Sequence, residues 1–319
     1  MADSLTLLQC AEDDEAFYHN TPEIIKPIVF KLVNGPSQEY IFNSAGSKIK
    51  KGVKMKPKLV IVGAAGRMGK RILALAAEQQ KFDIIAAVEK NDHPDIGKDA
   101  GLLAGIAPLD LKISPDFAPG ADCLIDFSTP DAADLSVDYC LENNAALVLG
   151  TTGLYTEQHE KIKSAAEKIP VIYGTNMSVG MNVLFNLAAK TAQMLGDDYD
   201  TEIIEQHHRF KKDAPSGSAL TLAENIARAT NKKFPDCLTH GRKGKDALRQ
   251  KGTIGIHAVR AGDITGIHSV VFSTLGESVT LNHTAHSRDG FANGALRAAD
   301  WLTGKNPGLY SMADCLGIK

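Results

Sequence analysis

The sequence feature that most constrains the fold is an apolar run followed at once by a glycine-rich turn. Residues 59–62 read Leu-Val-Ile-Val, which is typical of a strand buried on both faces. Residues 63–69 read Gly-Ala-Ala-Gly-Arg-Met-Gly, and the Ala- and Leu-rich residues 67–80 have the pattern of a helix. A strand that enters a helix through such a turn presents backbone N–H groups to an anion at the positive end of the helix. The pattern predicts a dinucleotide-binding unit.

Further strands and helices follow at regular spacing. We expect strands at residues 84–88, 123–127, 146–149 and 171–173, each apolar and short. Ser128, Thr129 and Pro130 have the composition of a helix cap and first turn, and Thr156 is predicted to cap the next helix. Strands that alternate with helices at this spacing indicate an α/β fold with a Rossmann-like, doubly wound parallel sheet.

The rhythm changes after about residue 179. A helix to residue 195, a strand near 202–205 and a helix over 218–230 precede three strand-like runs at 253–259, 264–273 and 278–285. These three runs resemble a meander, so we expect a second α+β domain with a mixed or antiparallel sheet. The helix at 290–303 is predicted to return to the first domain. The predicted domains are residues 56–178 with 289–319, and residues 179–288.

Residues 1–55 differ from the rest of the chain. They open with an acidic run, and we interpret them as an N-terminal extension without fixed order that contains a short strand at 28–33. No basic flank of a signal or transit peptide precedes them, and no apolar run is long enough to span a membrane. We therefore expect a cytoplasmic protein.

Charge and cysteine content exclude several classes of function. A formal charge of -3 argues against general binding to nucleic acid or to anionic membranes, because such binding needs a strong basic surplus. The five cysteines are scattered, odd in number and without a Cys-x-x-Cys pair, so neither a disulfide framework nor a zinc knuckle is indicated. No metal is expected either, because His207 and His208 are adjacent rather than four residues apart on a helix.

Several residues are predicted to contact the cofactor. Glu89 ends the second strand about 20 residues after the glycine turn, where a carboxylate accepts hydrogen bonds from ribose hydroxyls. Lys90 follows it and offers a cation to a ribose 2′-phosphate, so the prediction is use of NADH or NADPH. The loops at 150–153 and 174–177 follow later strands and, with Phe127 and Ser128, are expected to line the nicotinamide pocket, although ordinary turn chemistry also favours Gly, Thr and Asn there.

The segment at residues 205–219, Glu-Gln-His-His-Arg-Phe-Lys-Lys-Asp-Ala-Pro-Ser-Gly-Ser-Ala, concentrates positive charge in a slightly acidic protein. His207 and Lys211 can hold a mobile proton, whereas Arg209 carries a fixed charge. A helix beginning near Ser218 adds N–H groups that attract anions. Cations beside a helix N-terminus predict a site for a small dicarboxylate.

The motifs along residues 57–319 are similar to those of the 4-hydroxy-tetrahydrodipicolinate reductase (dihydrodipicolinate reductase) family. They include Gly-Arg-Met-Gly, Asp-Phe-Ser at 126–128, Gly-Thr-Thr-Gly at 150–153, Asn-Met-Ser-Val-Gly at 176–180, the segment at 205–218, Arg-Ala-Gly-Asp at 260–263 and Phe-Ala-Asn-Gly at 291–294. The resemblance implies an enzyme of the diaminopimelate route to lysine that uses NADH or NADPH. It also implies a homotetramer built through the sheets of the second domain.

The resemblance further implies the roles of individual residues. His207 is similar to the catalytic histidine of the family and Lys211 to its proton donor, while His208, Gly217 and Ser218 are similar to the ligands of the substrate carboxylates. The residues similar to the cofactor site of the family are Gly63, Ala64, Ala65, Gly66, Arg67, Met68, Glu89, Lys90, Phe127, Gly150, Thr151, Thr152, Gly174, Thr175, Asn176 and Met177.

The sequence departs from the family pattern at a few positions. Phe210 stands where several relatives have histidine, Ser218 where threonine is common and Thr129 where some have arginine. Only Thr129 belongs to the cofactor pocket, so it affects the expected preference between NADH and NADPH. Two alternatives remain open at this point: another NAD(P)-dependent dehydrogenase of a small amino or dicarboxylic acid, such as an aspartate dehydrogenase, and a non-catalytic dinucleotide sensor.

Overall fold

The computed structural model describes residues 40–42, 48–50 and 55–318. Of the N-terminal extension it describes one antiparallel pair, β1 (Tyr40–Phe42) with β2 (Lys48–Lys50). The strand predicted at 28–33 lies outside the described residues. From Lys56 onward the chain forms one compact unit that contains two sheets.

The first sheet has seven strands in the order β14-β8-β7-β6-β3-β4-β5, and all of its pairs are parallel. Its strands are β3 (Lys58–Val62), β4 (Asp83–Val88), β5 (Ile113–Ser114), β6 (Cys123–Asp126), β7 (Ala146–Leu149), β8 (Pro170–Tyr173) and β14 (Gly308–Tyr310). The central strands are buried along their length, as the apolar runs predict. The predicted Rossmann-like sheet is confirmed.

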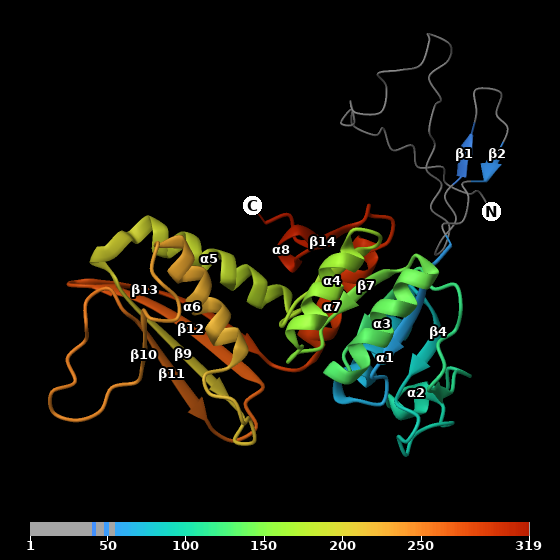
Figure 1. Ribbon diagram of the computed structural model, residues 1–319, viewed down its shortest axis with the longest axis horizontal. Coiled ribbons are helices and arrows are strands. Elements are labelled where there is room, and N and C mark those ends of the chain that lie inside the picture. The colour runs from blue at the N-terminus through green and yellow to red at the C-terminus, as the bar shows by residue number, and fades with distance from the viewer. Residues whose placement is uncertain (1–39, 43–47, 51–54, 319) are drawn as a thin grey trace, which may run out of the picture. The chain divides into compact units, whose positions relative to one another are not determined.

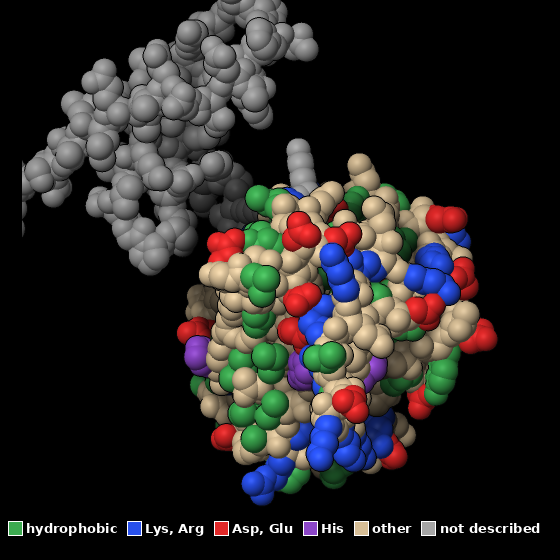
Figure 2. Space-filling model, turned by 90° about the vertical axis from the view of Figure 1, so that its left-hand side faces the viewer, with side chains coloured by type: hydrophobic (Ala, Val, Ile, Leu, Met, Phe, Trp, Pro, Cys, Tyr) green, Lys and Arg blue, Asp and Glu red, His purple; other side chains and the backbone are tan. Residues whose placement is uncertain are grey.

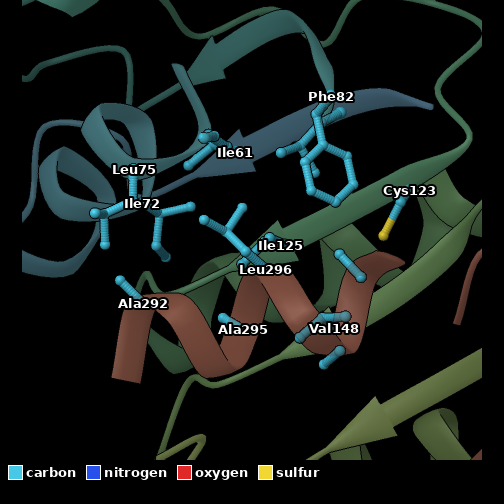
Figure 3. Packing of buried hydrophobic residues seen from close by; sticks show 14 of the residues in the cluster. Ile61, Ile72, Leu75, Phe82, Cys123, Ile125, Val148, Ala292, Ala295 and Leu296 are labelled. Atoms are coloured by element: carbon cyan, nitrogen blue, oxygen red, sulfur yellow. The ribbon is translucent and has the colours of Figure 1, made fainter. Parts of the chain in front are cut away.

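Helices cover both faces of this sheet (Figure 1). One hydrophobic cluster joins the sheet to α1 (Arg67–Gln79) and α7 (Asp289–Leu302). Figure 3 shows Ala292, Ala295 and Leu296 of α7 packed towards Ile125 and Val148 of the strands. The second cluster joins the opposite face to α3 (Pro130–Asn143) and α4 (Thr156–Ala166). The short helices α2 (Ala100–Leu103) and α8 (Met312–Cys315) complete this part.

The helix starts agree with the sequence at one place and differ at another. Pro130 is the first residue of α3 and Thr129 its N-cap, as predicted. Thr156, however, is already helical, and Tyr155 occupies the cap position of α4. The side chain of Gln158 accepts a hydrogen bond from the Tyr155 N–H at 3.0 Å. Gln158 thus accepts from the N–H of the cap residue itself, whereas a threonine hydroxyl at the cap would have accepted from an N–H of the first helical turn.

The second sheet has five strands in the order β10-β11-β9-β12-β13. These strands are β9 (Asp200–His207), β10 (Leu238–His240), β11 (Ile254–Arg260), β12 (Gly266–Thr274) and β13 (Glu277–Ala285). Helices α5 (Val179–Leu195) and α6 (Gly217–Ala229) pack on one face, where Leu184, Leu222 and Phe272 share a core; a 3₁₀ turn (Gly196–Asp198) follows α5. The mixed sheet of the second part is confirmed.

The predicted meander is wrong. Strands β12 and β13 form an antiparallel pair, but β11 does not pair with β12. Instead β9 lies between them, parallel to β11 and antiparallel to β12. The connection from β9 to β11 includes α6, and a helical crossover brings the next strand back parallel to the first. Strand β12 then takes the other edge of β9.

None of the helices in the described part of the chain has the length and hydrophobicity that a membrane crossing requires.

Candidate active site

The centre of the parallel sheet is the point at which the strand order reverses. Strand β3 pairs with β4 on one side and with β6 on the other. The strands that follow β3 in the chain are therefore added first on one side of it and then on the other. The loops that follow β3 and β6 leave from the same edge of the sheet. Ligands of open α/β sheets bind in the crevice at this position.

Two positions of the turn after β3 have room only for glycine. Gly63 has a φ of +74°, and a Cβ atom there would lie 2.5 Å from the carbonyl oxygen of Phe127. A Cβ atom on Gly69 would lie 2.1 Å from the carbonyl oxygen of Gly63. The N-cap of α1 is Gly66, which has no side chain to accept from the first turn. The N–H groups of that turn lack intrahelical acceptors and therefore suit the pyrophosphate of a dinucleotide.

Glu89 and Lys90 lie at the end of β4, beside this loop. The Glu89 Oε2 accepts a hydrogen bond from the Ala65 N–H at 3.2 Å, so the carboxylate is held against the glycine turn. The Lys90 ammonium group is exposed and pairs with Asp92 at 3.2 Å. A carboxylate beside the turn fits ribose hydroxyls, because it can only accept hydrogen bonds when ionised.

Asp126, which the sequence analysis did not single out as a site residue, organises the loops on the other side of the switch point. Its side chain is fully buried. It accepts hydrogen bonds from the Ser128 N–H at 2.8 Å and from the hydroxyls of Ser128, Ser136 and Thr151 at 2.6, 2.6 and 2.8 Å. This carboxylate therefore fixes the loop after β6 to the loop after β7. The sequence did contain a signal for this role, namely an aspartate at the end of an otherwise apolar strand.

The remaining predicted cofactor residues form the rim of these loops. A Cβ atom on Gly150 would lie 2.4 Å from the ring of Phe127, so glycine is needed where the ring covers the backbone. Thr152 and Thr175 are exposed. The Met177 side chain belongs to the hydrophobic core, which leaves only its backbone for a ligand.

One hydrogen bond joins a predicted cofactor residue to a predicted substrate residue. The Asn176 side-chain amide donates to the Ser218 hydroxyl at 2.8 Å. Asn176 follows β8 of the parallel sheet, and Ser218 lies in the first turn of α6, on the second sheet. The start of α6 therefore faces the carboxyl edge of the parallel sheet.

The basic segment begins at the end of β9. His207 is the last residue of that strand and is 9% exposed. Lys211 pairs with Asp213 at 2.9 Å, and the Nδ1 atom of His208 is buried without a hydrogen-bond partner in the described part of the molecule. Ser216 caps α6 by accepting from the Ala219 N–H at 3.2 Å. The segment thus places a histidine, a lysine and a helix N-terminus close together in the chain.

A buried ion cluster lies beneath the basic segment. The fully buried Glu205 accepts from His207 Nδ1 at 2.5 Å, from the Ser216 N–H at 3.0 Å, and from the two terminal nitrogens of Arg260 at 2.7 and 2.9 Å. Burial alone would raise the pKa of Glu205, but the hydrogen bonds from His207 and Arg260 outweigh it and lower the pKa to about 2. Glu205 is therefore ionised at neutral pH. The sequence analysis assigned no role to Glu205 or Arg260, although both lie in its motifs.

His268 of β12 packs beside this cluster. Its ring lies 5.2 Å from that of His207, centroid to centroid, and its Nε2 is 3.4 Å from the Ser216 hydroxyl. Burial lowers the pKa of His268 to about 3, and the positive charge of a protonated His207 acts in the same direction. His268 is therefore neutral at physiological pH and adds no second charge next to His207.

The structure does not join all the predicted site residues. Among the described residues, no hydrogen bond or ion pair links His207 or Lys211 to the loops at 63–69, 150–152 or 174–177. Nor does any group of three or more His, Cys, Asp or Glu side chains in residues 55–318 have the arrangement of a metal site.

The loops at the switch point and the basic segment at residues 205–219 together indicate the class of protein. A Rossmann-like sheet with a glycine turn, an acidic strand end and a facing lobe of mixed sheet is the architecture of an NAD(P)-binding oxidoreductase.

Comparison with known proteins identifies the family. The family models for the N-terminus and the C-terminus of dihydrodipicolinate reductase match residues 57–177 and 180–316. The 4-hydroxy-tetrahydrodipicolinate reductase of Syntrophus aciditrophicus is 43% identical over 265 residues, which cover 82% of this chain and 99% of that protein. The enzyme of the same name from Anaeromyxobacter dehalogenans is 45% identical over 265 residues, covering 82% and 98%. The chain belongs to the dihydrodipicolinate reductase family.

A solved structure has the same fold. Dipicolinate-bound dihydrodipicolinate reductase from Paenisporosarcina sp. TG-14 matches with a TM-score of 0.61 and 24% identity, over 82% of this chain and 99% of that one.

Proposed function

We propose that the protein is a 4-hydroxy-tetrahydrodipicolinate reductase that uses NADH or NADPH, acting in the cytoplasm in the diaminopimelate route to lysine. The observation that carries this proposal is the match of both family models, together with identities of 43 and 45% to reductases that this chain covers almost end to end. Loss of the 4-hydroxyl group as water gives a conjugated cyclic imine that bears two carboxylates, and addition of a hydride and a proton to this imine gives the tetrahydro product.

The cofactor assignment is supported by the glycine positions of the turn after β3 and by the carboxylate of Glu89 beside it. We assign the pyrophosphate to the turn at residues 63–68, the adenosine ribose to Glu89, and the nicotinamide to the loops that Asp126 holds, with Phe127, Thr151 and Asn176. The reduced nicotinamide, when bound, supplies the hydride. The chain fixes its position through backbone donors and excludes water with the Phe127 ring.

The substrate assignment is supported by charge. We assign the two carboxylates to His208, the Gly217 N–H and Ser218, at the start of α6. A helix N-terminus and nearby cations attract anions, and each charge-assisted hydrogen bond contributes about 1.5–3 kcal/mol.

The proton transfer is assigned to Lys211 and His207. Hydride addition at carbon pushes electron density towards the ring nitrogen and the neighbouring carbon of the substrate, and this developing negative charge needs a cation and a proton. Lys211 is held by Asp213, so it must exchange this carboxylate for the substrate when it acts. Positioned acid groups contribute on the order of 10²- to 10⁴-fold in rate.

A coupled assay tests the function. Dihydrodipicolinate synthase, pyruvate and aspartate semialdehyde would generate the substrate, and oxidation of NADH or NADPH would be followed with wild-type protein and with buffer. We expect Lys211→Met and His207→Gln to lower kcat by about 10²- to 10⁴-fold while cofactor affinity changes by less than about three-fold. Lys212→Met, which removes the neighbouring exposed lysine, is the matched control.

Two results would contradict the proposal. Unchanged turnover in both variants would remove Lys211 and His207 from the mechanism. Cofactor binding without any substrate-dependent oxidation would favour the non-catalytic sensor.

We also propose a homotetramer built on the second sheet. Side chains of β9 and β12 alternate between buried and half-exposed, and the half-exposed set includes Ile204, Ile267 and Val271 on one face. Helices α5 and α6 pack against the opposite face. A view onto the end of the molecule shows hydrophobic side chains gathered along one side of the surface (Figure 2). The same face also carries Glu202, Gln206, Ser269 and Ser273, so apolar and polar side chains are mixed on it. A mixed sheet face of this kind suits a symmetric contact between copies.

The assembly is tested by placing a charge on that face. Val271→Asp should convert tetramers into smaller species, because an unpaired carboxylate in a closed interface is costly. Size-exclusion chromatography with light scattering gives the mass of each species. Leu135→Asp, at a side chain that is 60% exposed on α3, should leave the mass unchanged. A wild-type monomer would exclude the tetramer.

A further inference from the structure

Glu205 and His207 lie on the same side of β9 because side chains two residues apart on a strand point the same way. Both are buried, and the carboxylate of Glu205 is 2.5 Å from Nδ1 of His207. An ionised carboxylate can only accept hydrogen bonds, so this contact requires a proton on Nδ1. Nε2 is then the ring nitrogen that is free to gain or lose a proton.

All the neighbours of Glu205 in this cluster are donors. Besides His207, Arg260 donates two hydrogen bonds and the Ser216 backbone donates one. The guanidinium group of Arg260 is positively charged and stabilises the ionised carboxylate of Glu205. The proton between Glu205 and His207 therefore stays on His207. A neutral amide in place of Glu205 would point its NH₂ group at one of these donors.

The Glu205 carboxylate also contacts the start of α6. The Ser216 N–H that it accepts precedes Gly217 and Ser218, the residues assigned to the substrate carboxylates. One side chain therefore fixes both the ring of His207 and the first turn of α6.

We infer that Glu205 is a positioning residue that fixes the proton of His207 on Nδ1, so that Nε2 exchanges the proton with the substrate, and that Arg260 holds Glu205 in the ionised state for this task. The inference rests on the proposed role of His207 in the reductase reaction. A histidine oriented by a buried carboxylate has one tautomer and one direction for proton transfer.

The first test is made on the wild-type protein without substrate. Two-bond ¹H–¹⁵N correlation spectra of ¹⁵N-histidine-labelled protein distinguish the two neutral tautomers, and the His207 signals among the ten histidines are those lost in His207→Gln. We expect neutral His207 to carry its proton on Nδ1. A proton on Nε2 would overturn the inference whether or not Glu205 variants fold.

The second test is kinetic. We expect Glu205→Gln to lower kcat by about 10²-fold while the KM for NADH or NADPH changes by less than about two-fold, and Glu205→Asp to recover part of the loss, because it keeps the charge. Loss of folded protein would also lower the apparent kcat at constant KM, so kcat is calculated per cofactor-binding site, titrated with NADH or NADPH, and only a loss that remains after this correction supports the inference. Turnover of Glu205→Gln within about two-fold of wild type would overturn the inference.

Glu202 provides a matched control on the same strand. It accepts from Arg242 at 2.6 Å, from Arg249 at 3.0 Å and from His257 at 2.7 Å, so it resembles the Glu205 cluster in composition. It lies three positions earlier and points to the opposite face of the sheet. Glu202→Gln should keep kcat within about two-fold of wild type at the same protein concentration. An equal loss in both variants would indicate a structural effect and overturn the positioning role.

Failure of the proposed function is distinguishable from failure of this inference. If wild-type protein does not reduce the substrate, the function is wrong, but the tautomer measurement still decides how Glu205 holds His207.

Discussion

Two acidic side chains at the carboxyl edge of the parallel sheet are held by hydrogen bonds from backbone N–H groups and from hydroxyls. Glu89 is held by the Ala65 N–H, and Asp126 gathers three hydroxyls and one backbone N–H. These acceptors are preorganised, because their geometry does not depend on a ligand. In the proposed cofactor site, hydrogen bonds within the chain thus hold the glycine turn and the loops that Asp126 joins.

Lys90 is the residue with which the choice of cofactor can be tested. Its side chain is 66% exposed and its ammonium group pairs only with Asp92 among the described residues, so a ribose 2′-phosphate can reach it. We expect Lys90→Ala to lower kcat/KM for NADPH by about ten-fold relative to NADH, since one exposed charge-assisted contact is worth about 1–1.5 kcal/mol. Steady-state kinetics with both cofactors measures the ratio.

Lys98→Ala is the control for Lys90→Ala, because Lys98 is similarly exposed and pairs with Asp95 at 2.6 Å. The same ratio of kcat/KM for NADPH to kcat/KM for NADH in both variants would deny Lys90 any role towards the phosphate.

At the scale of elements, α6 carries the predicted substrate ligands in its first turn. Its cap, Ser216, is buried and accepts from the Ala219 N–H, so it satisfies a donor that the helix cannot. We expect Ser216→Ala to lower the free energy of unfolding by about 1–2 kcal/mol and to raise the KM for the substrate, because the first turn frays. Urea unfolding and steady-state kinetics measure the two effects.

Asp99 caps α2 in the same way, through the Leu102 N–H at 2.9 Å, and is not among the residues assigned to the site. Asp99→Ala should leave the KM unchanged. A Ser216→Ala protein with wild-type KM would mean that the α6 cap matters for stability alone.

At the scale of the whole molecule, two buried or half-buried carboxylates link stability to pH. Burial alone would raise the pKa of Glu202, but hydrogen bonds from Arg242, His257 and Arg249 outweigh it and lower the pKa to about 2. The pKa of Glu205 is also about 2, because its own donors outweigh burial. A carboxylate with a lowered folded-state pKa stabilises the protein above its unfolded pKa, which is near 4.3. That contribution is lost as the pH falls towards 2.

The free energy of unfolding should therefore decrease as the pH is lowered from about 4.5 to about 2, by about 1–3 kcal/mol for each of these groups. Denaturant unfolding at several pH values gives the slope. Glu202→Gln and Glu205→Gln should be less stable at neutral pH and show a shallower dependence. Glu142→Gln, at an exposed glutamate without an ion pair in the described residues, should follow the wild-type slope.

Much of the fold was predictable because its signals are local. Neighbouring residues and backbone geometry determine the strand at residues 58–62, the glycine turn after it and the helix that follows. The alternation of strands and helices likewise predicted the parallel sheet. Motifs in this order also identified the family without any knowledge of contacts.

Other features were decided only by the tertiary structure. The position of β9 between β11 and β12 depends on the crossover through α6, and strand periodicity contains no information about which strand becomes the neighbour. Glu205 meets Arg260, 55 residues later, only because β9 and β11 are adjacent and parallel.

The sequence by itself thus determined which segments form strands and helices, where the glycine turn lies and which side chains can carry a proton. The tertiary structure decided which of those side chains meet, because burial and hydrogen bonding between residues far apart in the chain exist only after the sheets have formed.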